Sequence, residues 1–287
     1  NSTNKIRDLS LEIDKLRIPN HIAVIMDGNG RWGVNKGLTR SHGHSEGVSV
    51  LKNIIKASKK LGVKKGMVLA VKTDIRFLGP YESNNQNELL NDHYDALANI
   101  IDLNEGTIVV STGTTSLCNT NIPFDLDKTK SEMGSLTEFI RNKKGAKRSF
   151  HPFNSYSAIG KHSAYICNYF NRHSVGPNTP EAKLIKLNAK YLSIGLHPKD
   201  SSTIIHHIEK TAGVPYRYIK EFHHPVVKNK KVVKEKFYLN VRYRESRIVM
   251  DLGKKIFPYF KKKGYKINEV KLGRGKIYLF SSKNFFL

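Results

Sequence analysis

Apolar residues in this chain occur in short runs and in helical spacings, separated by polar loops. A nearly continuous apolar run at 21–26, rich in β-branched residues, is typical of a buried parallel strand. Residues 48–61 carry apolar side chains three and four positions apart, which predicts an amphipathic helix. The other predicted elements are strands at 67–71, 107–110, 191–195, 237–243 and 276–281, helices at 89–101, 135–141, 202–210 and 246–260, and loops at 148–155 and 223–225. This alternation of strands and helices predicts an α/β protein.

Composition agrees with a globular chain. Of its 287 residues, 39% are hydrophobic and 25% are charged, which suits a protein with a buried core. No run approaches the ~18 consecutive apolar residues of a membrane span, and residues 1–18 lack the apolar centre of a signal peptide. Cys118 and Cys167 are too few for a disulfide framework or a cysteine zinc site, so we expect a cytoplasmic location.

The charge balance is strongly basic. Lys and Arg number 49 and Asp and Glu 24, which gives a net charge of +25 and favours anionic partners. Compositional bias is the alternative explanation, because most of the excess is lysine. The lysine-rich runs at 228–236 and 261–266 are expected to be solvated surface. One function hypothesis is therefore a polyanion-binding or membrane-surface-binding protein with an inactive enzyme fold.

A glycine-containing motif directly follows the first predicted strand. Two glycines there let backbone amides converge on an anion, and an arginine adds a planar guanidinium that can donate two hydrogen bonds to the same anion. The stretch has the sequence MDGNGRW and is followed by TRSHGH. Over residues 18–64 the chain resembles the start of undecaprenyl diphosphate synthase, a cis-prenyltransferase. The resemblance implies that Asp27 binds Mg²⁺, and that the diphosphate is held by Gly28, Asn29, Gly30, Arg31, Arg40 and His44.

The rest of that family's substrate site does not follow. Its Ser-x-Glu-Asn-Trp and Arg-x-Ser segments are absent, and Trp32 is the single tryptophan of the chain. We therefore treat a cis-prenyltransferase acting on prenyl diphosphates as a lesser alternative, and expect Mg²⁺ only if this motif is functional. If the motif is not functional, it is a relic or the product of a gene joint.

A second resemblance covers residues 48–287. The blocks that carry it are LGVKKGMVLAVKTDIRFLG, EGTIVVSTGTTS, GSLTEFIRNKKGAKRSFHPFNSYSAIG, GPNTPEAKL, SIGLHPKDSSTIIHHIEK and LGRGKIYLFSSK, in that order. They resemble the aminoglycoside 3-N-acetyltransferase family. The resemblance implies an α/β fold with a central mixed sheet flanked by helices. It divides the chain into an N-terminal strand-loop extension at 1–47 and an acetyltransferase domain at 48–287.

The resemblance implies direct transfer of an acetyl group from acetyl-CoA to an amine, without a covalent enzyme intermediate. Such a reaction needs a base for the amine proton and donors for the thioester oxyanion. His151 occupies the His-Pro position of the family and is the expected general base. Glu138, on the preceding predicted helix, is the expected carboxylate that orients the imidazole and stabilises its charged form.

Further residues are assigned by the same resemblance. The expected acceptor-site residues are His206, His207 and Glu209, and the expected acetyl-CoA ligands are Thr112, Thr114, Thr115 and Arg148. The expected partners are CoA and a small-molecule amine, either an aminoglycoside or a less basic amino sugar. Nucleic acid is not expected, a membrane surface is the weaker alternative, and the oligomeric state stays open. Twelve histidines without a His-x-x-x-His and carboxylate pattern predict no metal site.

Overall fold

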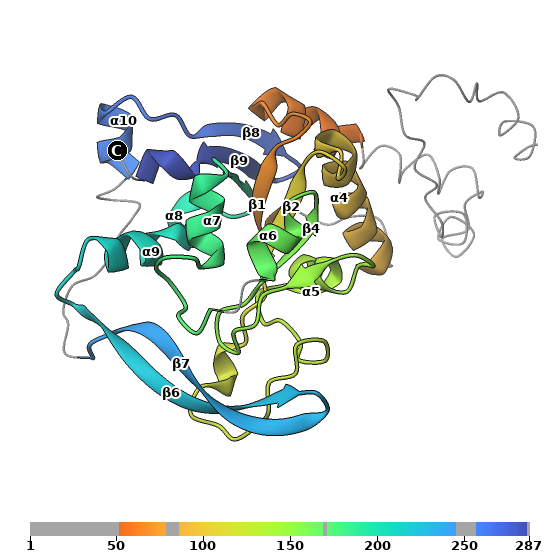
Figure 1. Cartoon of the computed structure of the whole chain (residues 1–287). Coiled ribbons are helices and arrows are strands. Elements are labelled where there is room, and N and C mark those ends of the chain that lie inside the picture. Colours follow the sequence, from red (N-terminus) through yellow and green to blue (C-terminus); the bar gives the residue numbers. More distant parts are fainter. Residues whose placement is uncertain (1–51, 79–85, 169–170, 245–256, 286–287) are drawn as a thin grey trace, which may run out of the picture.

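A seven-stranded sheet forms the centre of the protein, and a two-stranded ribbon lies apart from it (Figure 1). The computed structural model describes residues 52–78, 86–168, 171–244 and 257–285. The sheet has the order β3–β4–β2–β1–β5–β9–β8. Its strands are β1 (Val68–Thr73), β2 (Thr107–Ser111), β3 (Lys147–Arg148), β4 (Tyr156–Gly160), β5 (Lys190–Ile194), β8 (Asn268–Leu272) and β9 (Gly275–Ser281).

The sheet is mixed. Strand β1 runs parallel to both β2 and β5, whereas β4 and β9 continue the sheet on either side by antiparallel pairing. Strands β1 and β2 are apolar on both faces and buried along most of their length, as expected for parallel strands covered from both sides. The predicted fold class, a mixed sheet flanked by helices, is confirmed.

Helices pack on both faces and form two separate apolar cores. One core joins the helix at 52–61 with α4 and α5, and the other joins α6, α7, α9 and α10. The helices are α4 (Gln86–Ile101), α5 (Ser135–Arg141), α6 (Ser163–Cys167), α7 (Pro180–Lys186), α8 (Pro198–Ser201), α9 (Ile204–Thr211) and α10 (Phe257–Lys262). Short 3-10 turns are η1 (Ile75–Leu78), η2 (Thr115–Leu117) and η4 (Ser282–Phe285). No helix among the described residues has both the length and the apolarity that a membrane span requires.

The ribbon consists of β6 (Arg217–Lys228) and β7 (Lys231–Arg242). It covers a small aromatic core of its own, which includes Phe124, Phe153 and Phe237. The predicted loop at 223–225 is wrong, because these residues lie inside β6. Pro225 is compatible with the strand since its carbonyl faces Phe124, from which it accepts a hydrogen bond of 2.9 Å, and not the partner strand. No ladder hydrogen bond is therefore lost at the proline.

Several sequence predictions fall on residues outside the described parts. These are the strand at 21–26, the diphosphate motif, the domain boundary near 47 and most of the predicted helix at 246–260. The described part of the predicted helix at 48–61 is helical from 52 to 61. It buries Ile54, Ala57 and Leu61 in the first core.

Candidate active site

The predicted site residues form two groups, both beyond the carboxyl ends of the parallel strands. One group lies on α9, which follows β5. The other lies in the loop after β2 and in the segment that leads into β4, because β4 begins opposite the last residue of β2. Ligands of open α/β sheets bind at this edge, so the fold places both groups where a substrate site is expected.

An imidazole–carboxylate pair lies on α9. Nδ1 of His206 is 3.1 Å from Oε2 of Glu209, which sits one helical turn further along. The two side chains differ sharply in exposure: 47% of His206 is exposed but only 3% of Glu209. A buried carboxylate that accepts from Nδ1–H leaves the Nε2 lone pair of an exposed imidazole available to a substrate.

Two further residues fix the position of Glu209. Nε of Arg217 lies 2.5 Å from Oε2, and the hydroxyl of Tyr216 donates to Oε1 over 3.1 Å. Burial alone would raise the pKa of Glu209, but the hydrogen bond from His206 and the charge of Arg217 lower it below its ordinary value. Glu209 is therefore ionised at neutral pH, and its carboxylate can accept a hydrogen bond from Nδ1–H of His206.

His207 points into the protein instead. Its Nδ1 accepts a hydrogen bond from the backbone N–H of Gly176, and burial lowers its pKa although Glu181 opposes the shift. A buried imidazole held by backbone is a structural group, so the expected acceptor-site role of His207 is not supported by its contacts.

His151 is enclosed by the ribbon core. Its ring packs edge-to-face against Phe153 and Phe237, and only 3% of the residue is exposed. Nδ1 accepts hydrogen bonds from the backbone N–H groups of Phe153 and Asn154, at 3.3 and 3.1 Å. A ring that accepts at Nδ1 carries its hydrogen on Nε2, so Nε2 is a donor and has no lone pair to offer.

The protonation state of His151 agrees with this assignment. Burial lowers its pKa to about 3, although the backbone of Tyr238 and Arg172 opposes the shift. The imidazole is thus neutral and sequestered. These contacts favour a structural role for His151 over the predicted role as general base, because a base needs an accessible lone pair.

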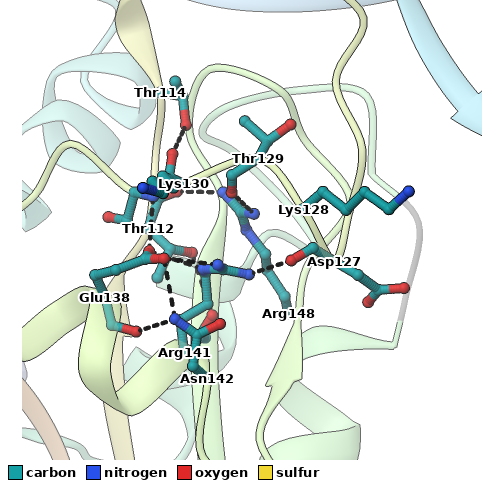
Figure 2. Close-up of polar contacts among 12 residues, drawn as sticks. Thr112, Thr114, Asp127, Lys128, Thr129, Lys130, Glu138, Arg141, Asn142 and Arg148 are labelled. Atoms are coloured by element: carbon teal, nitrogen blue, oxygen red, sulfur yellow. Dashed lines mark hydrogen bonds and ion pairs between the residues drawn. The ribbon is translucent and has the colours of Figure 1, made fainter.

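Glu138 does not contact His151. Its carboxylate accepts hydrogen bonds from the guanidinium of Arg141, from Asn142 and from the backbone N–H of Ser131. These bonds lower the pKa of Glu138 to about 2 against the effect of burial. The predicted pairing of Glu138 with His151 is corrected: the carboxylate instead fastens α5 to the loop that precedes it (Figure 2).

Arg148 is turned inward as a brace. Its guanidinium donates to the carbonyls of Leu126, Thr129 and Thr112 and to the hydroxyl of Ser155, at 2.6–3.1 Å. Figure 2 shows Arg148 with Thr112 and Thr129. Burial lowers its pKa to about 10. With four hydrogen bonds made inside the protein, the contacts of Arg148 favour a structural role over the predicted role as a ligand of a CoA phosphate.

The predicted threonine ligands are also bonded internally. The hydroxyl of Thr112 lies 3.0 Å from that of Ser155, the hydroxyl of Thr114 donates to the carbonyl of Lys130, and the hydroxyl of Thr115 donates to Glu132. Thr112 and Thr114 are buried and Thr115 is exposed. Their hydroxyls hold the loop after β2 together, so a role in binding the thioester or pantetheine arm would require these bonds to exchange.

Sequence reasoning missed a buried polar cluster beside α9. Glu181 is 1% exposed and accepts hydrogen bonds from the hydroxyls of Tyr156, Tyr191 and Thr203. Lys72, at the end of β1, adds a positive charge near it. The available signal was Lys72, a charged residue that directly follows the continuous apolar run of the predicted strand at 67–71.

Comparison with known proteins decides the family. The sequence profile described as aminoglycoside 3-N-acetyltransferase matches residues 71–287, about three quarters of the chain. The chain belongs to the aminoglycoside 3-N-acetyltransferase family. The resemblance inferred from the sequence blocks is therefore confirmed.

Solved structures of this type share the acetyltransferase fold. Aminoglycoside acetyltransferase AAC(3)-Xa aligns with a TM-score of 0.69 at 21% identity, over 82% of this chain and 89% of that one. AAC-IIIb in a binary complex with CoASH gives 0.68 at 19%, over 82% and 92%. Sisomicin-bound AAC-VIa gives 0.67 at 19%, over 82% and 94%. At these identities the likeness shows the fold of the acetyltransferase domain.

Some curated relatives of this chain belong to another class. The isoprenyl transferase of Prochlorococcus marinus is 61% identical over 67 residues, which are 23% of this chain and 25% of that protein. That of Clostridium tetani is 32% identical over 145 residues, 49% of this chain and 56% of that protein. The chain thus spans between a quarter and just over half the length of these relatives. They confirm the N-terminal resemblance, whose motif residues lie outside the described part of the chain.

Proposed function

We propose that this protein transfers the acetyl group of acetyl-CoA to an amine of an aminoglycoside or of another amino sugar. The observation that carries the proposal is the His206–Glu209 pair: an exposed imidazole backed by a buried carboxylate, in a chain of the 3-N-acetyltransferase family. A CoASH complex and a sisomicin complex among proteins of the same fold support this donor and this class of acceptor.

His206 is the proposed general base, in place of His151. Its Nδ1 also lies 3.2 Å from Nη2 of Arg217, but the shorter contact, to the carboxylate of Glu209, favours a proton on Nδ1. Nε2 then removes a proton from the attacking amine, and the imidazolium that forms is stabilised by Glu209. Arg217 and Tyr216 position Glu209 for that task.

The surroundings of the two cysteine thiols support direct transfer, in which no cysteine is acetylated. Cys167 is buried, donates to the carbonyl of Tyr156 and has its pKa raised by burial to about 12. Burial also raises the pKa of Cys118. Since the thiolate is the nucleophilic form, neither cysteine is suited to carry the acetyl group. Both cysteines are free, which agrees with a reaction in the reducing cytoplasm.

The charge of the protein bears on which acceptor it would take. Glu209 is already paired with a histidine and an arginine, so it adds little attraction for a polycation. A chain with net charge +25 repels highly basic aminoglycosides at long range. A less basic amino sugar therefore fits at least as well as an aminoglycoside.

The test is release of the CoA thiol from acetyl-CoA, measured over a panel of acceptors. The panel contains aminoglycosides, which carry several amines, and amino sugars whose single amine is their only basic group. Turnover with at least one acceptor, lost in His206→Asn, is the expected result. Acetyl-CoA that binds but is never consumed, or turnover that survives His206→Asn unchanged, would contradict the proposal.

A second candidate rests on the far end of the ribbon. Lys230, Lys231 and Lys234 are exposed there, and so is Val232, with 59% of its surface accessible. A basic tip with an exposed apolar residue suits an anionic membrane surface. Acetyl-CoA should raise the melting temperature under the first proposal, whereas only acidic vesicles should do so under the second.

A further inference from the structure

A row of four polar side chains crosses the sheet at the carboxyl end of β1. Ser111 pairs with Tyr156, and Lys72 pairs with Ser193. The register of β1 and β2 places Lys72 beside Ser111, and its ammonium donates a hydrogen bond to the Ser111 hydroxyl. Side chains of paired residues lie on one face of a sheet. On this face the row stands at the carboxyl end of β1, and the apolar core lies toward the amino end.

The carboxylate of Glu181 lies against this row. Its oxygens accept hydrogen bonds from Tyr156, from Tyr191 and, at 3.0 Å, from Thr203. The hydroxyls of both tyrosines are thereby committed to Glu181, and burial raises their pKa well above the ordinary value. They remain neutral at physiological pH and hold Glu181, whose negative charge raises the pKa of Lys72 against the larger effect of burial.

Lys72 differs from the rest of the row in exposure and in bonding. Ser111, Tyr156 and Ser193 are buried, whereas Lys72 is partly exposed. Its ammonium uses one of three hydrogens on Ser111, and it lies 5.7 Å from the centre of the Tyr156 ring. No other hydrogen bond of Lys72 is found in the described part of the chain. An ammonium that is held in place and has N–H groups without an acceptor can donate a hydrogen bond to a ligand.

The row is connected to the proposed base. Thr203, which donates to Glu181, immediately precedes α9, and His206 lies one helical turn beyond it. The charged end of Lys72 and the imidazole of His206 thus belong to the same carboxyl edge of the sheet, where a ligand is expected.

We propose that Lys72 is a catalytic residue that donates a hydrogen bond to the thioester carbonyl oxygen of bound acetyl-CoA. The inference rests on the proposed function. The amine nitrogen attacks the carbonyl carbon, and negative charge develops on the oxygen that Lys72 holds. The amine proton passes to His206, the C–S bond breaks, and that proton leaves with the CoA sulfur. Lys72 keeps its own protons throughout, and acts by stabilising charge that appears in the transition state.

A binding experiment tests the contact without any acceptor. Acetyl-CoA labelled with ¹³C at the carbonyl is bound to the full chain, and the carbonyl stretch is recorded by isotope-edited infrared spectroscopy. A strong hydrogen bond lowers the frequency in the wild type, and Lys72→Met should return it toward the free value while the Kd for CoA itself changes less than about threefold. Lys190→Met is the matched control, since Lys190 is also partly buried and bonded to a serine, Ser281, at the opposite edge of the sheet.

A pH profile separates a donor from a structural lysine. Burial lowers the pKa of Lys72 to about 8, and a neutral amine is a weaker donor, so turnover should decline above that pH. The other titratable groups around it are Tyr156, Tyr191, Glu181 and His207; the tyrosines titrate far higher and the histidine pKa is lowered. Lys72→Arg should keep partial activity and move the alkaline decline to higher pH, whereas Lys72→Met should lose ~10²-fold or more in kcat at pH 7.

The outcomes are distinguishable. An unchanged carbonyl frequency in Lys72→Met, or an alkaline limb that Lys72→Arg does not move, would overturn the role of Lys72 and leave the proposed function standing. An acetyl adduct on Lys72 or Ser111 in intact-protein mass spectrometry would also overturn it. Failure of acetyl-CoA to bind the wild-type chain would remove the proposed function and this inference together.

Discussion

Nδ1 of His206 lies 3.1 Å from Oε2 of Glu209, and a proton held in this contact leaves the lone pair of the half-exposed ring on Nε2. The opposite arrangement holds at His151, where Nδ1 is occupied by two backbone N–H groups and the ring is enclosed by phenylalanines. Both histidines come from family blocks, but only one has the surroundings of a base. Hydrogen-bond direction, rather than residue type, makes this distinction.

The first prediction concerns the base. His206→Asn should lower kcat by ~10²- to 10⁴-fold with little effect on acetyl-CoA binding, because a base acts in the transition state. Glu209→Gln should lower kcat less, since it orients and stabilises the imidazole. His223→Asn is the control, because His223 is another exposed histidine paired with a glutamate, Glu221, on the ribbon. Steady-state thiol release checks all three, and equal activity in the two histidine variants would refute the assignment.

The second prediction concerns His151, for which we expect a structural role. The pKa of His151 is about 3 in the folded chain against an ordinary 6.5, so the unfolded chain takes up a proton that the folded chain refuses. Its contribution to stability is complete above about pH 6.5 and is lost as the pH falls from there toward 3. His151→Asn keeps an acceptor for the two N–H groups and cannot titrate.

Denaturant unfolding at pH 7.5 and pH 5 checks this expectation. The wild type should lose more stability between the two pH values than His151→Asn does, and kcat of the variant should stay within about tenfold. His151→Ala should cost about 2–3 kcal/mol, because it leaves a cavity and two unpaired amides. A ~10²-fold loss of kcat in His151→Asn with unchanged stability would restore His151 as the base.

Much of the fold followed from local pattern. The predicted strands at 67–71, 107–110 and 191–195 correspond to β1, β2 and β5, because these central strands are apolar along their length. The predicted helix at 135–141 matches α5. The ribbon strand β6 was not predicted at all, because its sequence RYIKEFHHPVVK mixes charges, histidines and a proline. Such a sequence is permitted in a strand that is open on one side.

The site was harder to predict, since side-chain direction is a tertiary property. The resemblance identified His206 and Glu209 but assigned them to the acceptor. It placed Glu138 beside His151, whereas three groups near Glu138 in sequence bind its carboxylate first. From the sequence, Arg148 was predicted to bind a phosphate. In the structure its guanidinium donates to four acceptors inside the protein. Lys72 gained significance only from its place in a cross-strand row.

The third prediction concerns the Arg148 brace. Arg148→Met should destabilise the chain by about 2–4 kcal/mol, because three backbone carbonyls lose a charged donor. The Kd for CoA, measured by calorimetry, should remain within about threefold. Arg76→Met, at an arginine that is 86% exposed, is the control and should change stability by less than 1 kcal/mol. A tenfold loss of CoA affinity in a stable Arg148→Met protein would favour the phosphate-binding role instead.

The fourth prediction concerns the isoprenyl-transferase-like motif. Asp27→Ala should leave acetyl transfer unchanged, because the motif belongs to a different resemblance and the family's second substrate site is absent from the sequence. The wild-type chain with Mg²⁺, farnesyl diphosphate and isopentenyl diphosphate should form no longer prenyl product. Product above a no-enzyme control, abolished by Asp27→Ala, would show that the motif is functional.

The last prediction concerns the boundary near residue 47. The apolar stripe of the helix at 52–61 is already used: Ile54, Ala57 and Leu61 lie in the core that also contains Leu69 of β1. The carbonyl of Leu61 accepts a hydrogen bond from Asn268 of β8, which ties the helix to the last hairpin. One helical face cannot also pack on a second sheet, so residues 1–44 should contribute little to the acetyltransferase core.

A chain that begins at Ser45 should unfold cooperatively, with a melting temperature within a few degrees of that of the full chain, and still bind acetyl-CoA. A chain that begins at Gly62 is the control and should fail to fold, because burying Ile54 and Leu61 contributes about 2–3 kcal/mol each. Aggregation of the chain that begins at Ser45 would mean that the N-terminal segment is part of the core.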